Sequence, residues 1–160
     1  MIHRLDIRVI ATDEKSTKFD FFVDEEQLDS RFGINRLTNI AFTDFDLDLF
    51  EVDAVRFPGY NRLEIVKRAI NIFLGKEPAS NQLETGRVVL YRCHCGSDYC
   101  GVISFQLKIE EDYIYWIDIR HEIDGTWGPD DLDITVIPEL KFERPAYERL
   151  LNAFAEKYCF

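Results

Sequence analysis

Residues 87–120 read RVVLYRCHCGSDYCGVISFQLKIEEDYIYWIDIR, and this stretch decides the fold. Apolar residues alternate with polar ones on both sides of the acidic turn at 110–112, as they do in strands that bury one face. Three strands are expected here, at 88–93, 101–109 and 113–120. Together they predict an antiparallel meander around residues 87–119, with a cysteine-rich loop between its first two strands.

Two helices flank this meander in the sequence. The first is expected at about 62–74, where apolar residues recur at helical spacing after Asn61, a plausible N-cap, and before Gly75, which ends it. The second is expected at about 145–158, because Pro145 suits a first helical turn and a spaced apolar face follows it. The sequence therefore predicts an α+β fold in which both helices pack on an antiparallel sheet.

The remaining segments carry weaker signals. Alternation predicts strands at 2–11 and 19–23, a helical turn at 24–31 that ends at Gly33, and a strand at 132–137. Residues 44–51, DFDLDLFE, alternate acidic and apolar side chains, which predicts a strand with its carboxylates on one side.

Length and composition indicate an ordinary cytoplasmic protein of bacterial type. The chain has 160 residues, which fits one domain spanning 1–160, and it is 46% hydrophobic and 14% aromatic, a composition that disfavours disorder. It contains neither an apolar run long enough to cross a membrane nor a signal peptide at its first residues. Three close cysteines and one distant one make a poor disulfide framework, so we expect reduced thiols.

The formal net charge is −11, from 19 basic and 30 acidic residues. A field of this sign repels phosphate backbones, so we expect no binding to nucleic acid. It attracts basic proteins instead, although many cytosolic proteins are acidic for solubility alone.

The cysteine loop, CHCGSDYCG at 93–101, contains the one motif with chemical content. Thiolates and imidazoles are the ligands that zinc prefers, and a turn containing glycine lets neighbouring sulfurs converge. The candidate ligands are Cys93, Cys95, Cys100 and His121, with His94 and Cys159 as further options for the fourth position. Two alternatives stay open, a reduced hairpin whose cysteines only pack and a redox or nucleophilic thiol.

This loop, the flanking strands and the tail FERPAYE at 142–148 resemble a family of small bacterial proteins. Its members share a Cys-x(1–2)-Cys-Gly-x-x-x-Cys-Gly loop and some are labelled oxidoreductase. The resemblance covers the second half of the chain best and implies a shared domain, but the family offers no settled activity. A dinucleotide-binding glycine motif, which the oxidoreductase label would require, is absent from the sequence.

No catalytic motif is present in the sequence, so we expect no catalytic residues and favour a binding protein over an enzyme. A pair such as Cys95 and His121 would suit a thiolate nucleophile, but four cysteines and three histidines offer such pairs by chance. The enzymatic alternative is therefore a small zinc- or thiol-containing protein.

The leading hypothesis is a protein-binding module, most specifically an immunity-type inhibitor of a basic, nuclease-like toxin domain. Acidic inhibitors of this kind combine charge complementarity with aromatic anchors. The candidate partner-binding residues are Asp44, Asp46, Asp48, Glu51, Asp53 and Trp127.

Overall fold

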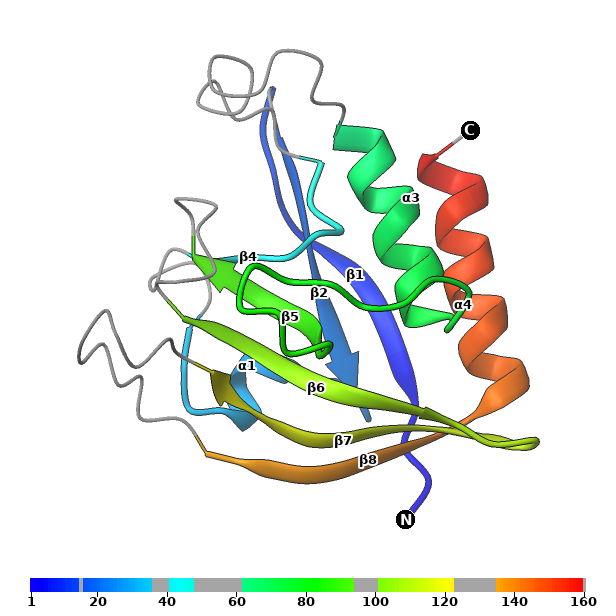
Figure 1. The fold of residues 1–160 in the computed structure, drawn as a ribbon. Helices are drawn as coiled ribbons and strands as arrows, with labels where there is room; N and C mark the ends of the chain where they lie inside the picture. Colours follow the sequence, from blue (N-terminus) through cyan, green and yellow to red (C-terminus); the bar gives the residue numbers. More distant parts are fainter. Residues whose placement is uncertain (15, 36–40, 48–61, 94–100, 123–134, 160) are drawn as a thin grey trace.

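The protein has an α+β fold built on a five-stranded antiparallel sheet (Figure 1). The structure, a computed structural model, describes residues 1–14, 16–35, 41–47, 62–93, 101–122 and 135–159. The strand order of the large sheet is β4-β5-β6-β7-β8. Its strands are β4 (Ala41–Phe42), β5 (Val88–Cys93), β6 (Val102–Ile109), β7 (Tyr113–Glu122) and β8 (Ile137–Glu143).

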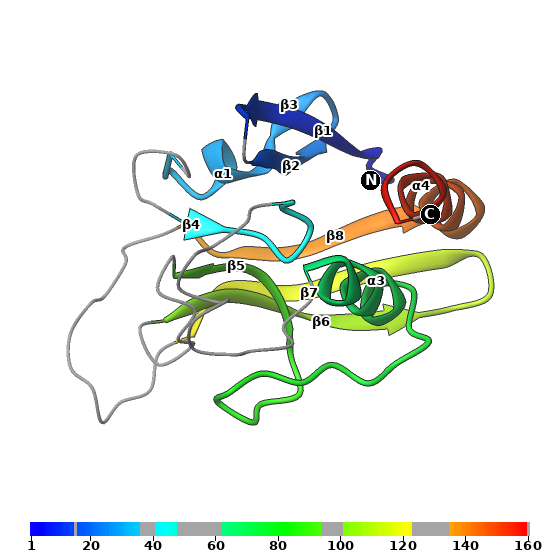
Figure 2. The ribbon, with the colours of Figure 1, turned by 90° about the horizontal axis from the view of Figure 1, so that it is seen from above.

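A second, three-stranded antiparallel sheet forms a separate layer beside the large one (Figure 2). It consists of β1 (Leu5–Thr12), β2 (Thr17–Val23) and β3 (Glu26–Gln27), and the short helix α1 (Leu28–Arg31) follows directly. The first residues join the two sheets, because the backbone N–H of His3 donates to the Lys141 carbonyl oxygen at 2.7 Å.

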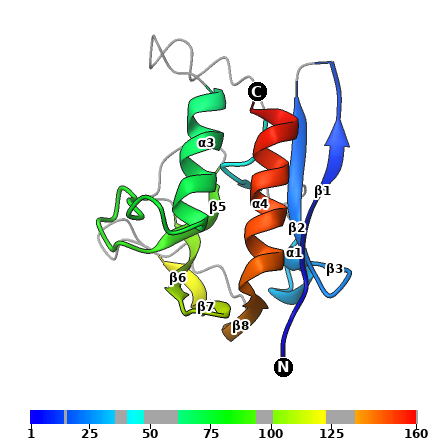
Figure 3. The same ribbon diagram turned by 90° about the vertical axis from the view of Figure 1, so that its right-hand side faces the viewer.

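The long helices α3 (Arg62–Phe73) and α4 (Arg144–Tyr158) lie side by side (Figures 1 and 3). Gly75 lies two residues after the end of α3; its φ of +75° suits glycine, and a Cβ there would collide with the Ile109 side chain. This close approach fixes the end of α3 against the end of β6.

The two sheets and both helices share one core, centred on Trp116 of β7. Its ring stacks on Phe105 with centroids 4.5 Å apart and meets the edges of further aromatic rings from β2, α3, β8 and α4. Trp116 Nε1 donates to the Tyr147 hydroxyl at 3.1 Å, which in turn donates to the Phe73 carbonyl oxygen at 2.9 Å. Burial raises the pKa of Tyr147, so the hydroxyl stays a donor and cross-links β7, α4 and α3.

The meander and both long helices confirm the predicted α+β class and its main elements. Of the strand expected at 132–137, residues 132–134 lie outside the described residues and 135–136 are not in a strand, whereas β8 runs from Ile137 to Glu143. Pro138 is tolerated in β8 because this strand is at the edge of the sheet. Asn61, the expected N-cap, lies outside the described residues. No helix in the described part of the chain combines the length and apolarity needed to cross a lipid bilayer.

Candidate functional site

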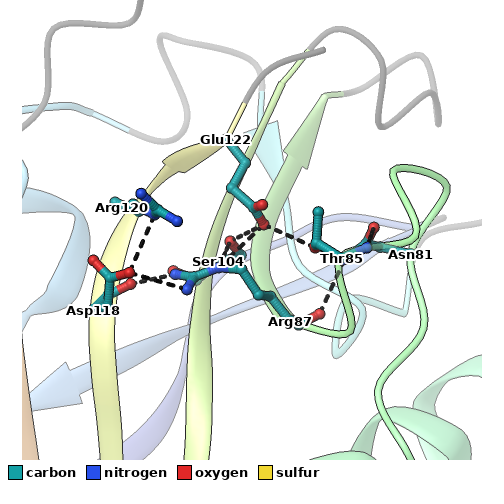
Figure 4. A network of polar contacts seen from close by, with 7 residues as sticks. All are labelled: Asn81, Thr85, Arg87, Ser104, Asp118, Arg120 and Glu122. Carbon is teal, nitrogen blue, oxygen red and sulfur yellow. Dashed lines mark hydrogen bonds and ion pairs between the residues drawn. The ribbon is translucent and has the colours of Figure 1, made fainter.

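A polar network lies at one end of the outer face of the large sheet, on the side away from the core (Figure 4). Its centre is Arg87, which precedes β5 and is 4% exposed. Arg87 Nε donates to Ser104 Oγ at 3.0 Å, and Nη2 donates to the carbonyl oxygens of Ser104, at 3.1 Å, and of Asp118. Nη1 donates to the Asp118 carboxylate at 3.2 Å. Every nitrogen of this guanidinium therefore has an acceptor.

Glu122 supplies a second carboxylate to the network. Its Oε1 lies 3.2 Å from Arg87 Nε and accepts hydrogen bonds from Ser104 Oγ and, at 3.3 Å, from Thr85 Oγ1. Asn81 Nδ2 donates to Thr85 Oγ1 at 2.8 Å and to the Arg87 carbonyl oxygen at 3.1 Å. These bonds tie the segment between α3 and β5 onto the sheet.

A β-bulge in β7 brings Asp118 into the network. Ser104 pairs with Arg120 and Gln106 pairs with Ile117, so two residues of β7 lie opposite one residue of β6. Asp118 has a φ of +53°, a conformation that Asp tolerates better than most residues. Its carboxylate lies 3.3 Å from Arg120 Nε, which adds a second cation.

The network is balanced in charge, with two arginines facing two carboxylates. Ser104 is fully buried and bonded to Glu122, and no imidazole or thiol from the described part of the chain is among the residues of this network. His121, next to Glu122 in β7, faces the opposite side of the sheet by strand alternation. Because Arg87 and Ser104 are buried and hydrogen-bonded to other members of this network, we assign the network to stabilising the sheet.

The predicted zinc ligands are only partly described. Cys93 ends β5, where it pairs with Ala41, whereas Cys95, Cys100 and His94 lie outside the described residues. A Cβ at Gly101 would collide with the His121 ring, so this imidazole lies against the residue that follows Cys100 in the chain. Among the described residues, no three His, Cys, Asp or Glu side chains are grouped as a metal site would require. The zinc site stays a prediction.

Cys159, the other predicted option for a ligand, lies at the end of α4 as part of the apolar core. Burial raises the pKa of its thiol, and the nearby charge of Lys67 offsets this only in part. Because metals bind the thiolate, this environment disfavours Cys159 as a ligand.

Asp44, the first residue of the acidic stripe, forms a two-pronged ion pair with Arg92 of β5. Arg92 Nε lies 2.8 Å from Asp44 Oδ1, and Nη2 lies 2.8 Å from Oδ2. Burial alone would raise the pKa of Asp44, but the Arg92 guanidinium outweighs burial and the pKa is lowered. The carboxylate is thus engaged within the protein.

The strand expected at 44–51 was wrong over its described part, since residues 44 and 45 form a turn. Asp46 has no exposed surface, and its carboxylate accepts from the backbone N–H groups of Phe19, at 2.9 Å, and Thr43, at 3.1 Å. Arg62 of α3 donates to the carbonyl oxygens of Asp46 and Thr43. A side chain so buried has no surface for a partner. The other predicted partner-binding residues, Asp48, Glu51, Asp53 and Trp127, lie outside the described residues.

The other end of the outer face is open and carries two tyrosines in neighbouring positions of β7. We call this the Tyr face and define it by Tyr113, Tyr115 and Ile117 with the flanking acids Glu110, Glu111, Asp112, Glu139 and Glu143. Lys141 Nζ lies 4.0 Å from the Tyr113 ring centroid, and Lys108 Nζ lies 5.3 Å from that of Tyr115. The five acids exceed these two lysines, so the Tyr face is negative. Sequence analysis missed it as a site, although the alternating tyrosines of β7 were its signal.

Comparison with family models, with curated proteins and with solved structures gives no match for this chain.

Proposed function

We propose that this chain is a protein-binding module that captures a basic partner domain, in the manner of an immunity-type inhibitor of a nuclease-like toxin. One observation carries the proposal, namely the unbalanced negative charge around the half-buried tyrosines of the Tyr face. Tyrosine is enriched among residues that dominate binding energy, and surrounding charge speeds the encounter with an oppositely charged partner.

The distribution of buried charge supports this proposal. The charged side chains buried in the described part nearly cancel, since three are aspartates and two are arginines: Asp20, Asp29, Asp46, Arg62 and Arg87. Burial therefore does little to reduce the formal charge of −11, and exposed acidic side chains outnumber exposed basic ones among the described residues. A long-range field of this sign favours a basic partner and disfavours nucleic acid.

The geometry of the Tyr face is also suited to docking. Tyr113 and Tyr115 are half-buried, with ring centroids 6.5 Å apart, so their bodies are already held in place. The Tyr115 hydroxyl donates to Glu110 at 3.2 Å, and the lysines lie against the rings. Preorganised side chains lose little rotamer entropy when a partner binds. We place this interaction in the cytoplasm, where the cysteines of the chain would remain reduced.

The test is affinity capture from the source cells, followed by a salt titration of the purified complex. We expect a basic partner whose association rate falls as ionic strength rises. An acidic partner, or binding indifferent to salt, would contradict the proposal. The matched control is Glu156→Gln, an exposed acid on α4 outside the Tyr face, which should leave binding unchanged.

A second candidate function is a zinc- or thiol-dependent protein, and the placement of His121 favours it. Three cysteines of the loop at 93–101 are near in sequence, and the imidazole lies against Gly101 at the end of this loop. When bound, zinc would supply either a structural cross-link or a Lewis acid. Membership in the family with the cysteine loop is part of this second proposal.

Metal analysis of protein purified without chelator separates the two candidates. Zinc near one equivalent per chain, reduced by His121→Ala but not by His3→Ala, would support the second candidate. Protein without zinc and with unreactive thiols would leave the cysteines a packing role.

A further inference from the structure

A groove that does not include the tyrosines of the Tyr face runs between the first residues of the chain and the N-terminal half of α4. These two segments lie side by side in Figure 3. Its volume is about 670 Å³, within the range typical of small-molecule sites. The apolar residues that line it are Ile2, Leu5, Phe142, Ala146, Tyr147 and Leu150, of which Phe142 and Tyr147 are almost fully buried. Such a surface suits an aliphatic or aromatic body.

The charged groups that line the groove are not equally available. His3 is paired with Asp24 at 2.6 Å, and Asp6 is paired with Arg8 at 2.7 Å. These contacts engage the carboxylate of Asp6 and the Nδ1 atom of His3 within the protein.

Arg4 and Arg149 differ from these groups. Both are exposed, and neither guanidinium forms an ion pair with any residue in the described part of the chain. Glu143, at the start of α4, is the one lining acid without an ion pair among the described residues, and it does not cap the helix with its side chain. The groove is therefore locally positive, on a protein whose overall charge is −11.

We propose that this groove binds an amphipathic monocarboxylate, a small molecule with one carboxylate and an aliphatic body. Guanidinium groups recognise carboxylates through paired hydrogen bonds, which Arg4 and Arg149 have free to offer. The aliphatic body would cover Ile2, Leu5 and Leu150. A single charge suits the site better than a phosphate, because Glu143 and the field of the whole protein oppose further negative charge.

The test is titration with sodium octanoate, followed by amide chemical shifts, with octanamide as the neutral analogue of equal length. We expect saturable shifts at residues 2–6 and 142–150, and weaker binding of octanamide. The double variant Arg4→Gln with Arg149→Gln should weaken octanoate binding about tenfold, as expected for lost charge-assisted contacts.

The matched control is Lys76→Gln, an exposed cation beyond α3 that should leave octanoate binding unchanged. Urea unfolding of the arginine variant checks that it is folded. Absence of saturable binding at millimolar octanoate, equal binding of octanamide, shifts confined to other regions, or unchanged affinity in the arginine variant would each overturn the proposal.

Discussion

The two ends of the outer face of the large sheet differ in their balance of positive and negative side chains. At the Arg87 end, two arginines and two carboxylates neutralise one another, and the central guanidinium is buried with all its nitrogens bonded. At the Tyr face, five acids exceed two lysines and the side chains remain exposed or half-buried. Both ends belong to the same strands, β6 and β7.

This difference follows from the cost of burying charge. A charge without a partner is expensive to bury, so the covered end must be balanced and saturated with hydrogen bonds. The open end is under no such constraint, so an excess of one sign can persist there. We infer that the covered end stabilises the sheet while the open end is available to a partner.

The largest effect is expected from Arg87→Leu, which removes the buried cation that pairs with Glu122 and the donor to the carbonyl oxygens of Ser104 and Asp118. Breaking a buried ion pair in this way costs roughly 3–5 kcal/mol of the free energy of unfolding. Urea unfolding measures it. The control is Arg120→Gln at the half-exposed rim, for which we expect a change below about 1 kcal/mol. Equal losses of unfolding free energy in the two variants would contradict the distinction between the buried centre and the exposed rim of the network.

The second-largest effect is expected on the affinity for the partner when the tyrosines of the Tyr face are removed. Replacing Tyr113 and Tyr115 together by alanine should weaken partner binding by about 30- to 100-fold, or roughly 2–3 kcal/mol, as for central aromatic anchors. The two side chains lie on an open face, so the variant should still fold. Calorimetric titration of the captured partner provides the measurement. An unchanged dissociation constant would remove the Tyr face from the proposal.

A smaller effect is expected from neutralising two acids of the Tyr face, Glu139→Gln with Glu143→Gln. Rim charges act mainly on the association rate, so we expect this rate to fall a few-fold at low salt while the dissociation rate changes little. Stopped-flow mixing at two ionic strengths separates these rates. If the association rate of the variant remained lower at high salt, a direct contact would be responsible instead of long-range attraction.

The smallest effect is a change in acid sensitivity at the ion pair between Asp44 and Arg92. The folded protein holds the pKa of Asp44 below its ordinary value of 3.8, so the unfolded chain binds the proton more readily. The stabilisation is therefore complete above that value and is lost as the pH falls through the lower, folded pKa. Asp44→Asn should show a shallower loss of stability over this acidic range, as measured by urea unfolding at a series of pH values. An equally steep loss in the variant would assign the acid sensitivity to other carboxylates.

The sequence predicted the main elements of the fold because their patterns are local. The meander and both long helices follow from apolar residues that repeat with periods of about two and 3.6. The end of the strand predicted at 132–137 was placed too early, because Pro138 suggests the end of a strand and only the position of β8 at the sheet edge makes this proline acceptable.

The candidate sites were harder to predict because they depend on tertiary contacts. The acidic alternation at 44–51 predicted a strand with its carboxylates on one side. In the described part of this segment, Asp46 is instead buried, and its carboxylate accepts hydrogen bonds from the backbone N–H groups of Thr43 and of Phe19, which is 27 positions away. The Arg87 network depends on a bulge at Asp118 that no local pattern indicates. Likewise, the hydrogen bond from Tyr91 to the buried Asp20 joins residues 71 positions apart.

The most direct test of the proposed binding surface is amide chemical-shift mapping of the complex with the captured basic partner. We predict that the perturbed amides gather at residues 106–117 and 139–143, around the Tyr face, and that those near Arg87 change little. Perturbations confined to the Arg87 end or to the small sheet, with the amides of Tyr113 and Tyr115 unchanged, would contradict this account.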